Sequence, residues 1–249
     1  MGKKKQIAKR ISVNDWVKNI LNFDIDFDYF FIKAKEDYKE ETKGNYPKYY
    51  EGETLKEEKD ILFGNISKIF QKRGYLRREE FISIGLWKTP RQKRNFEDKD
   101  NSDETVRRIT QEVIKSEENK MKILVKGIKD DSGKEIKLKG VDVAVASAIL
   151  AIIYPKQYCV VDYRAKQALA WLKKCGESEP YDNCILKSYD DYLFISEFVR
   201  NTTHIDIYDK YLEIINGVAM KQDPKLNPRQ IELALWKFDK DKDREFWLI

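Results

Sequence analysis

The stretch LKGVDVAVASAILAIIYPKQYCVVDYRAKQAL, from Leu138 to Leu169, carries little charge in a 249-residue chain of which 37% is charged. It holds a Gly-Val-Asp turn at residues 140–142, an apolar run over Val143–Tyr154 that predicts a buried helix, and a break at Pro155. A single carboxylate, Asp162, follows a second apolar run and precedes another helical pattern. This lone acid at the end of the most apolar segment needs an explanation, either from chemistry or from helix capping.

The turn allows two interpretations. Gly140 can adopt a positive φ angle, and the helix expected after it exposes N-terminal amides that suit a DNA phosphate. Alternatively, Asp142 is simply the N-cap of that helix, and the turn is a corner between two helices. On the turn alone, the corner is the favoured interpretation.

Residues on both sides of this stretch have helical periodicity almost throughout. The pattern predicts helices over residues 54–73, 76–89, 103–114, 116–128, 163–175, 188–200, 205–220 and 227–241, loops over 91–103 and 177–184, and a turn at 129–134. Asn227 and Gln230 form a capping box for the last of these helices. We therefore expect an all-α domain over residues 51–249, preceded by a basic tail and an extra helical layer over residues 1–50.

The net charge of +5 is carried by five basic residues within the first ten positions, which hold no acid: Lys3, Lys4, Lys5, Lys9 and Arg10. The remaining chain is neutral by count, so total charge is weak support for a nucleic-acid partner and local clusters matter more. No apolar run reaches the roughly 18 residues of a membrane span, and the basic N-terminus lacks the apolar segment of a secretory signal. We expect a cytoplasmic protein with no membrane partner.

The chain has three cysteines, Cys159, Cys175 and Cys184, and a single histidine, His204. An odd number of cysteines fits a reducing compartment, and three are too few for a four-cysteine metal or iron–sulfur site. Cys159 stands in an apolar run and is expected to pack in the core. His204 is expected to be a capping or loop residue, so the sequence predicts no metal site.

The opening stretch resembles the helix-hairpin-helix DNA glycosylase superfamily, in which a hairpin grips the DNA backbone and a catalytic Asp starts the next helix. Asp162 follows Gly140 by 22 residues, which is close to the spacing in that family. Other positions also carry the small or apolar residues of the family pattern, namely Leu138, Val141, Ala146, Ile149, Leu150, Val160 and Val161. The resemblance covers about residues 138–171 and implies a helical glycosylase-like fold with DNA as the partner; we expect a monomer.

Two positions depart from the family pattern. Asp142 stands where the family has a second glycine, and an acid beside a phosphate is unfavourable unless it turns inward to cap the helix. Ala144 stands where the bifunctional members carry a nucleophilic lysine, so Schiff-base chemistry from that position is excluded. With no cluster-binding cysteines either, the resemblance implies a monofunctional enzyme that uses water. We expect it to need no cofactor, unless a structural monovalent cation binds at the hairpin.

A carboxylate at position 162 suits the cleavage of an N-glycosidic bond even without the resemblance. Breaking that bond places positive charge on the sugar, and a nearby carboxylate stabilises the charge and orients or deprotonates water. The competing interpretation is that Asp162 only caps the helix that begins at Tyr163. The two roles are compatible, because the family's Asp also stands at the start of a helix.

A second candidate cluster is LWKTPRQKR, over residues 86–94. It places Trp87 beside four basic residues, namely Lys88, Arg91, Lys93 and Arg94. An aromatic ring flanked by cations suits base stacking together with phosphate contact. The alternative is that Trp87 packs in the core and the basic residues form a solvated loop.

The predicted DNA contacts are the hairpin, the basic cluster and the helix after Asp162, that is Lys139, Gly140, Val141, Asp142, Lys88, Arg91, Arg164 and Lys166, with Trp87 and Tyr163 at the base. The favoured function is a DNA glycosylase that flips out a damaged or modified base and leaves an abasic site, in DNA repair or anti-phage defence. One alternative is a non-catalytic nucleic-acid-binding module on the same fold, and another is a helical interaction protein. A nuclease built on Glu135 and Lys137 is disfavoured, because that motif needs a mixed sheet.

Overall fold

The computed structural model describes residues 59–169, 204–221 and 226–241. Within these ranges the chain is mostly helical, and its one sheet consists of two short strands. The all-α class expected from the sequence is therefore confirmed. The layer expected over residues 1–50, the helix expected over 188–200, and Cys175 and Cys184 lie outside the described residues.

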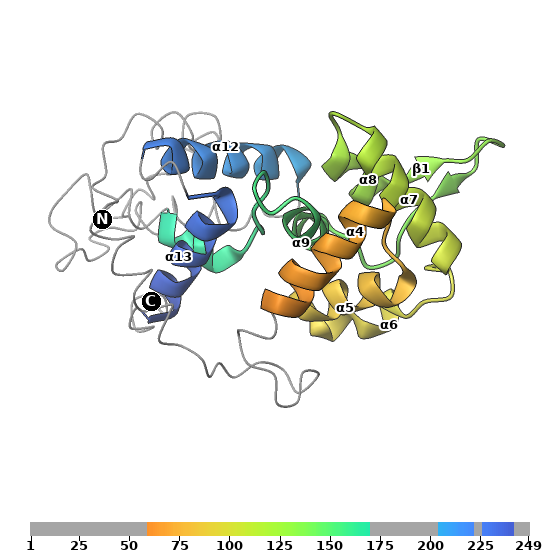
Figure 1. The fold of residues 1–249 in the computed structure, drawn as a ribbon, viewed down its shortest axis with the longest axis horizontal. Coiled ribbons are helices and arrows are strands. Elements are labelled where there is room, and N and C mark those ends of the chain that lie inside the picture. The colour runs from red at the N-terminus through yellow and green to blue at the C-terminus, as the bar shows by residue number, and fades with distance from the viewer. Residues whose placement is uncertain (1–58, 170–203, 222–225, 242–249) are drawn as a thin grey trace, which may run out of the picture.

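The described elements are η2 (Lys59–Ile66), α4 (Ser67–Arg73), α5 (Arg78–Lys88), η3 (Pro90–Gln92), α6 (Lys93–Phe96), α7 (Asp103–Lys115), α8 (Lys120–Lys126), β1 (Ile128–Lys129), β2 (Glu135–Ile136), α9 (Val143–Ile153), α12 (Ile205–Lys221) and α13 (Pro228–Asp241). Residues 163–169 are also helical. Helix α9 runs through the middle of the molecule, with α4, α5 and α8 on one side and α12 and α13 on the other (Figure 1). None of the helices in the described ranges is both long enough and apolar enough to cross a membrane.

Helix α9 is the centre of the core because its sequence is almost wholly apolar. All of its residues except Ala144 are buried. Its one polar side chain, Ser147, donates to the carbonyl oxygen of Ala144 at 2.8 Å and accepts from the amide of Val161 at 2.9 Å. The second bond ties the segment that leads into Asp162 to the N-terminal half of the central helix, the half that follows the turn at 140–142.

Two boundaries around the expected loop at 91–103 differ from the sequence prediction. The loop contains two short helical turns, η3 and α6, because Phe96 is fully buried and packs edge-to-face on Phe81 with ring centroids 6.0 Å apart. The N-cap of α7 is Ser102, which accepts from the amide of Thr105, so Asp103 is the first helical residue and not the cap. The first difference arises because Phe96 is the one aromatic residue in an otherwise polar segment.

The segment before the turn also differs from the prediction. A helix was expected from Ser116 to about Ile128, but Ser116 ends α7, and α8 begins at Lys120 and stops before Gly127. The antiparallel hairpin β1–β2 then pairs Ile128 with Ile136 and projects outward beyond α7 and α8 (Figure 1). The turn at 140–142 therefore follows a β-hairpin and does not directly join two helices.

Candidate active site around Asp162

The turn at residues 139–142 is held rigidly against α6. Gly140 has φ +81°, and a Cβ there would lie 2.9 Å from the ring of Phe96. The buried side chain of Asn101 accepts from the amide of Lys139 at 2.8 Å and donates to its carbonyl oxygen at 3.2 Å. Glycine is thus required by its positive φ, as expected, and also by close packing on Phe96. The sequence did not indicate this packing.

Asp142 caps α9, and its Oδ1 accepts from the amide of Val145 at 3.0 Å. This is the inward orientation under which an acid at this position is tolerated beside a phosphate. No described residue accepts a hydrogen bond from the amides of Gly140, Val141 or Asp142. The Val141 side chain is buried, so it is not placed to contact DNA.

Asp162 directly precedes the helical residues 163–169 and uses both carboxylate oxygens. Oδ1 accepts from the amide of Arg164 at 2.9 Å, which is the expected capping role. Oδ2 accepts from Lys88 Nζ at 2.8 Å, in an ion pair that joins residues 74 positions apart. The side chains of Lys88 and Asp162 are 11% and 21% exposed, so the pair is largely, but not wholly, screened from water.

The ion pair settles the charge of Asp162. Burial by itself raises the pKa of this carboxyl, but the charge and hydrogen bond of Lys88, and then the amide of Arg164, outweigh burial and leave the pKa below its usual value. Asp162 is therefore ionised at neutral pH. Lys88 was expected to contact phosphate, and the structure places it at the carboxylate instead.

Helix α13 supplies a second ion pair beside the first. Arg229 Nη1 donates to Glu232 Oε2, and the two side chains are 11% and 2% exposed. The guanidinium of Arg229 lies 5.7 Å from the centre of the Trp87 ring. Burial raises the pKa of Glu232, Arg229 opposes the shift, and the charges of Asp162 and Lys88 also act on it. The two ion pairs therefore form one electrostatic cluster.

Tyr211 of α12 belongs to the same cluster. Its side chain is fully buried, and its hydroxyl has no hydrogen-bond partner within the described part of the chain. Burial raises the pKa of this phenol, and the negative charges of Glu232 and Asp162 raise it further. We call Lys88, Asp162, Arg229, Glu232 and Tyr211 the Asp162 site.

Sequence reasoning missed three members of this site, Tyr211, Arg229 and Glu232. An Arg and a Glu three residues apart in a helix are usually an exposed pair, so the sequence held no signal that they are buried. The aromatic pattern of α12 marked Tyr211 as a core residue, which it is, but gave no reason to expect an unbonded hydroxyl.

Of the remaining residues that were predicted to contact DNA, some are exposed and one is buried. Tyr163 is half-exposed, with the guanidinium of Arg164 lying 5.4 Å from its ring centre, and Arg91 is exposed on η3. Lys139 is exposed and lies 3.8 Å from Asp100. Lys166 is fully buried, and burial lowers its pKa to about 7, so the prediction that it contacts the DNA backbone is wrong for this conformation.

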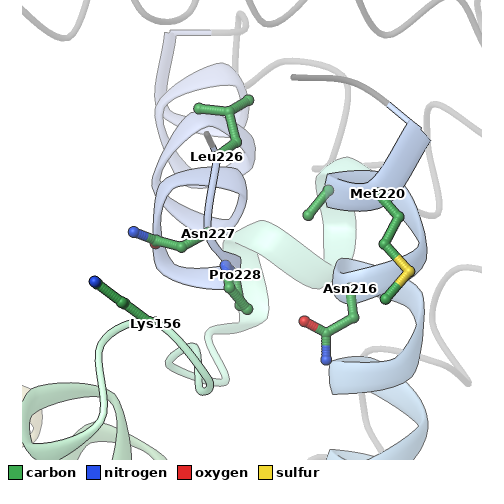
Figure 2. A pocket seen from close by; sticks show the side chains of 7 residues that line it. Lys156, Asn216, Met220, Leu226, Asn227 and Pro228 are labelled. Atoms are coloured by element: carbon green, nitrogen blue, oxygen red, sulfur yellow. The ribbon is translucent and has the colours of Figure 1, made fainter. Parts of the chain in front are cut away.

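A hollow of about 590 Å³ opens elsewhere, between the loop after α9, α12 and the start of α13. Figure 2 shows Asn216 and Met220 on α12, Asn227 and Pro228 at the start of α13, and Lys156 in the loop after α9. Asp162 does not line this hollow. The described residues contain no group of side chains suited to hold a metal ion.

The structure therefore brings together Trp87, Lys88 and Asp162 from the predicted set and adds three residues from α12 and α13. The turn at 139–142 leads directly into α9, and the segment that leads into Asp162 is bonded to Ser147, in the N-terminal half of the same helix. No protein-family model matches the chain, and no curated protein or solved structure matches it.

Proposed function

We propose that this protein is a monofunctional DNA glycosylase of the helix-hairpin-helix type, which hydrolyses the bond between a flipped base and its deoxyribose. The observation that carries the proposal is the ion pair between Asp162 and Lys88 at the start of a helix, 2.8 Å long and mostly screened from water. An ionised carboxylate in a site of low water content is what an oxocarbenium-like transition state requires.

In the proposed reaction, water attacks C1′ of the sugar as the C1′–N bond breaks, and the base leaves with the bonding electron pair and takes up a proton from solvent. Asp162 stabilises the positive charge on the sugar, accepts a proton from the attacking water and then releases that proton to solvent. Lys88 holds one carboxylate oxygen and keeps the group ionised down to low pH. Attack by water and not by an amine is favoured because position 144 carries Ala144, where the resembled bifunctional enzymes carry their lysine.

The surroundings of Asp162 suit a nucleic-acid substrate. Tyr163 offers an exposed aromatic face next to the carboxylate, and Arg164 lies over the same ring. Arg91 adds an exposed cation just beyond the end of α5. At the start of α9, the amides at residues 140–142, from which no described residue accepts a hydrogen bond, supply an anion site at a helix N-terminus.

A single-turnover assay on duplexes that each carry one damaged or modified base, followed by alkali to nick abasic sites, tests the proposal. Asp162→Asn should excise about a hundredfold more slowly, equivalent to about 2.7 kcal/mol, with DNA binding kept. Asp206→Asn is the matched control, because Asp206 is an exposed acid in the first turn of α12. Excision by Asp162→Asn at the wild-type rate would remove Asp162 from the mechanism. A borohydride-trapped adduct would contradict hydrolysis.

A non-catalytic nucleic-acid-binding module is the second candidate. The observation that favours it is that both oxygens of Asp162 are already bonded, one to Lys88 and one to the amide of Arg164. A carboxylate satisfied in this way can serve structure alone. For a module of this kind, duplex affinity should fall steeply with salt and weaken in Arg91→Glu, while no duplex in the panel loses a base.

A further inference from the structure

We infer that Arg229 and Glu232 of α13 are positioning residues of the Asp162 site, which hold Trp87 and Lys88 in place and balance the charge around the carboxylate. As a statement about base excision, this inference rests on the proposed function. As a statement about the geometry and charge of Asp162, it can be tested without any substrate.

A continuous series of contacts links α13 to the carboxylate. Glu232 accepts from Arg229, and Arg229 lies 5.7 Å from the centre of the Trp87 ring. Trp87 immediately precedes Lys88 at the end of α5, and Lys88 donates to Asp162 at 2.8 Å. A guanidinium over an indole face is attractive and fixes the orientation of the ring. The end of α5 is thus held from the α13 side by Arg229 and on the Asp162 side by the ion pair.

Burial separates this pair from ordinary helix pairs. An Arg–Glu pair three residues apart stabilises an exposed helix by only a few tenths of a kcal/mol and needs no burial to do so. Glu232 is 2% exposed, and desolvating two charges opposes folding unless close partners compensate. The pair therefore does more than stabilise α13, and the groups that its charges face are those of the Asp162 site.

The charged and titratable groups around Asp162 come from four elements. They are Lys88 of α5, Arg164 of its own helix, Tyr211 of α12, and Arg229 and Glu232 of α13. Lys88 and Arg229 balance Asp162 and Glu232, so this buried part of the site is close to neutral. The negative charge of Asp162 raises the pKa of Glu232, so neutralising Asp162 must favour the ionised form of Glu232.

Two conservative variants test the inference. Glu232→Gln keeps an acceptor for Arg229 but removes a negative charge beside the developing sugar cation, so the single-turnover rate at pH 7 should fall about tenfold. Arg229→Lys keeps the charge but removes the planar group over Trp87, so the rate should fall about tenfold to a hundredfold with DNA affinity unchanged. Glu104→Gln and Arg107→Lys are matched controls in α7, where the same pair is half-exposed, and should change neither quantity.

A measurement without substrate separates this inference from the proposed function. The side-chain carboxyl carbon of Glu232, assigned by its loss in Glu232→Gln, is titrated by ¹³C NMR in the wild type and in Asp162→Asn. Because the charge of Asp162 raises the pKa of Glu232, that pKa should be lower in Asp162→Asn and unchanged in Asp206→Asn. An unchanged pKa of Glu232 in folded Asp162→Asn overturns the role of Glu232 at the Asp162 site. A wild type that excises no base overturns the glycosylase and leaves the NMR result to decide the inference.

Discussion

The turn at residues 139–142 and the Asp162 site carry the two halves of the proposed activity, and they are built differently. In the turn, the functional groups are backbone amides from which no described residue accepts a hydrogen bond. In the Asp162 site, they are side chains in a mostly buried cluster, in which Asp162 is held by Lys88 from 74 positions away. An anion site made of backbone needs only a rigid turn, whereas a buried ion pair depends on each of its members.

The largest effect expected from this difference is that of Lys88→Met, which leaves Asp162 largely buried without its cation. Losing one member of a mostly buried pair should lower the free energy of unfolding at pH 7 by about 3 kcal/mol. Burial, the largest influence on Asp162, is then opposed only by the amide and charge of Arg164 and raises the pKa, so the variant should gain stability as the pH falls from 7 towards 4. In the wild type the folded-state pKa is lowered, so the contribution of the pair is present at neutral pH and is lost in acid.

Urea unfolding at several pH values measures this effect. The control is Lys115→Met, because Lys115 is 70% exposed and its pair with Glu112 should contribute almost nothing. The double variant Lys88→Met with Asp162→Asn removes the unpaired charge and should recover most of the lost stability. If Lys88→Met and Lys115→Met lost the same free energy of unfolding, the stability of the Asp162 site would not depend on Lys88.

The difference between a turn made of backbone and a cluster of buried side chains also explains how much of the candidate site could be predicted from the sequence. The turn, the cap at Asp142, the apolar helix and the carboxylate at 162 are local features, and Gly140, Asp142 and Asp162 were identified from spacing and residue type alone. The partner of Asp162 was not, because Lys88 stands in a basic run whose other members are exposed. No local pattern distinguishes a lysine that turns inward from one that faces water.

The burial of certain polar residues could not be predicted from the sequence either. Lys166 follows Asp162 by four residues, so it was expected on the same DNA-facing surface, yet it is fully buried. Glu232 is almost as buried, although it stands in a helix with many charged residues. Which helix packs on which face decides such cases, and that is a property of the whole fold.

A smaller effect is expected at the turn, from Gly140→Ala. A left-handed backbone costs an alanine about 1 kcal/mol, and a Cβ at 2.9 Å from Phe96 adds strain, so stability should fall by about 2 kcal/mol. The turn amides shift as the turn adjusts, so DNA affinity should weaken. The excision rate with the enzyme in saturating excess should stay at the wild-type value, because Asp162 is untouched.

The Gly133→Ala variant separates the cost of the left-handed backbone from the cost of crowding by Phe96. Gly133 has nearly the same φ, +83°, but nothing lies within 4 Å of an added Cβ. It should therefore lose only about 1 kcal/mol and keep its DNA affinity. Thermal unfolding and a salt-dependent binding curve check both variants. A Gly140→Ala variant that binds DNA as tightly as the wild type would rule out the turn as the phosphate site.

Tyr211→Phe should have the smallest effect on stability, and it is the sharpest test of the Asp162 site. The hydroxyl of Tyr211 is buried without a hydrogen-bond partner in the described ranges, so removing it should leave the free energy of unfolding unchanged or raise it by up to about 1 kcal/mol. Tyr208→Phe, three residues earlier in α12, is the control. The Tyr208 hydroxyl donates to the carbonyl oxygen of Cys159 at 3.1 Å, and its loss should cost about 1 kcal/mol.

Activity should move in the opposite sense from stability in these two variants. An unbonded hydroxyl close to Asp162 is suited to hold the attacking water, so Tyr211→Phe should excise about tenfold more slowly, a change of about 1.4 kcal/mol in the barrier. Tyr208→Phe should keep the wild-type rate, because its hydroxyl is already bonded within the core. A Tyr211→Phe variant with full activity would mean that water reaches Asp162 from the Tyr163 side of the site. A loss of stability in that variant would mean that its hydroxyl is bonded after all.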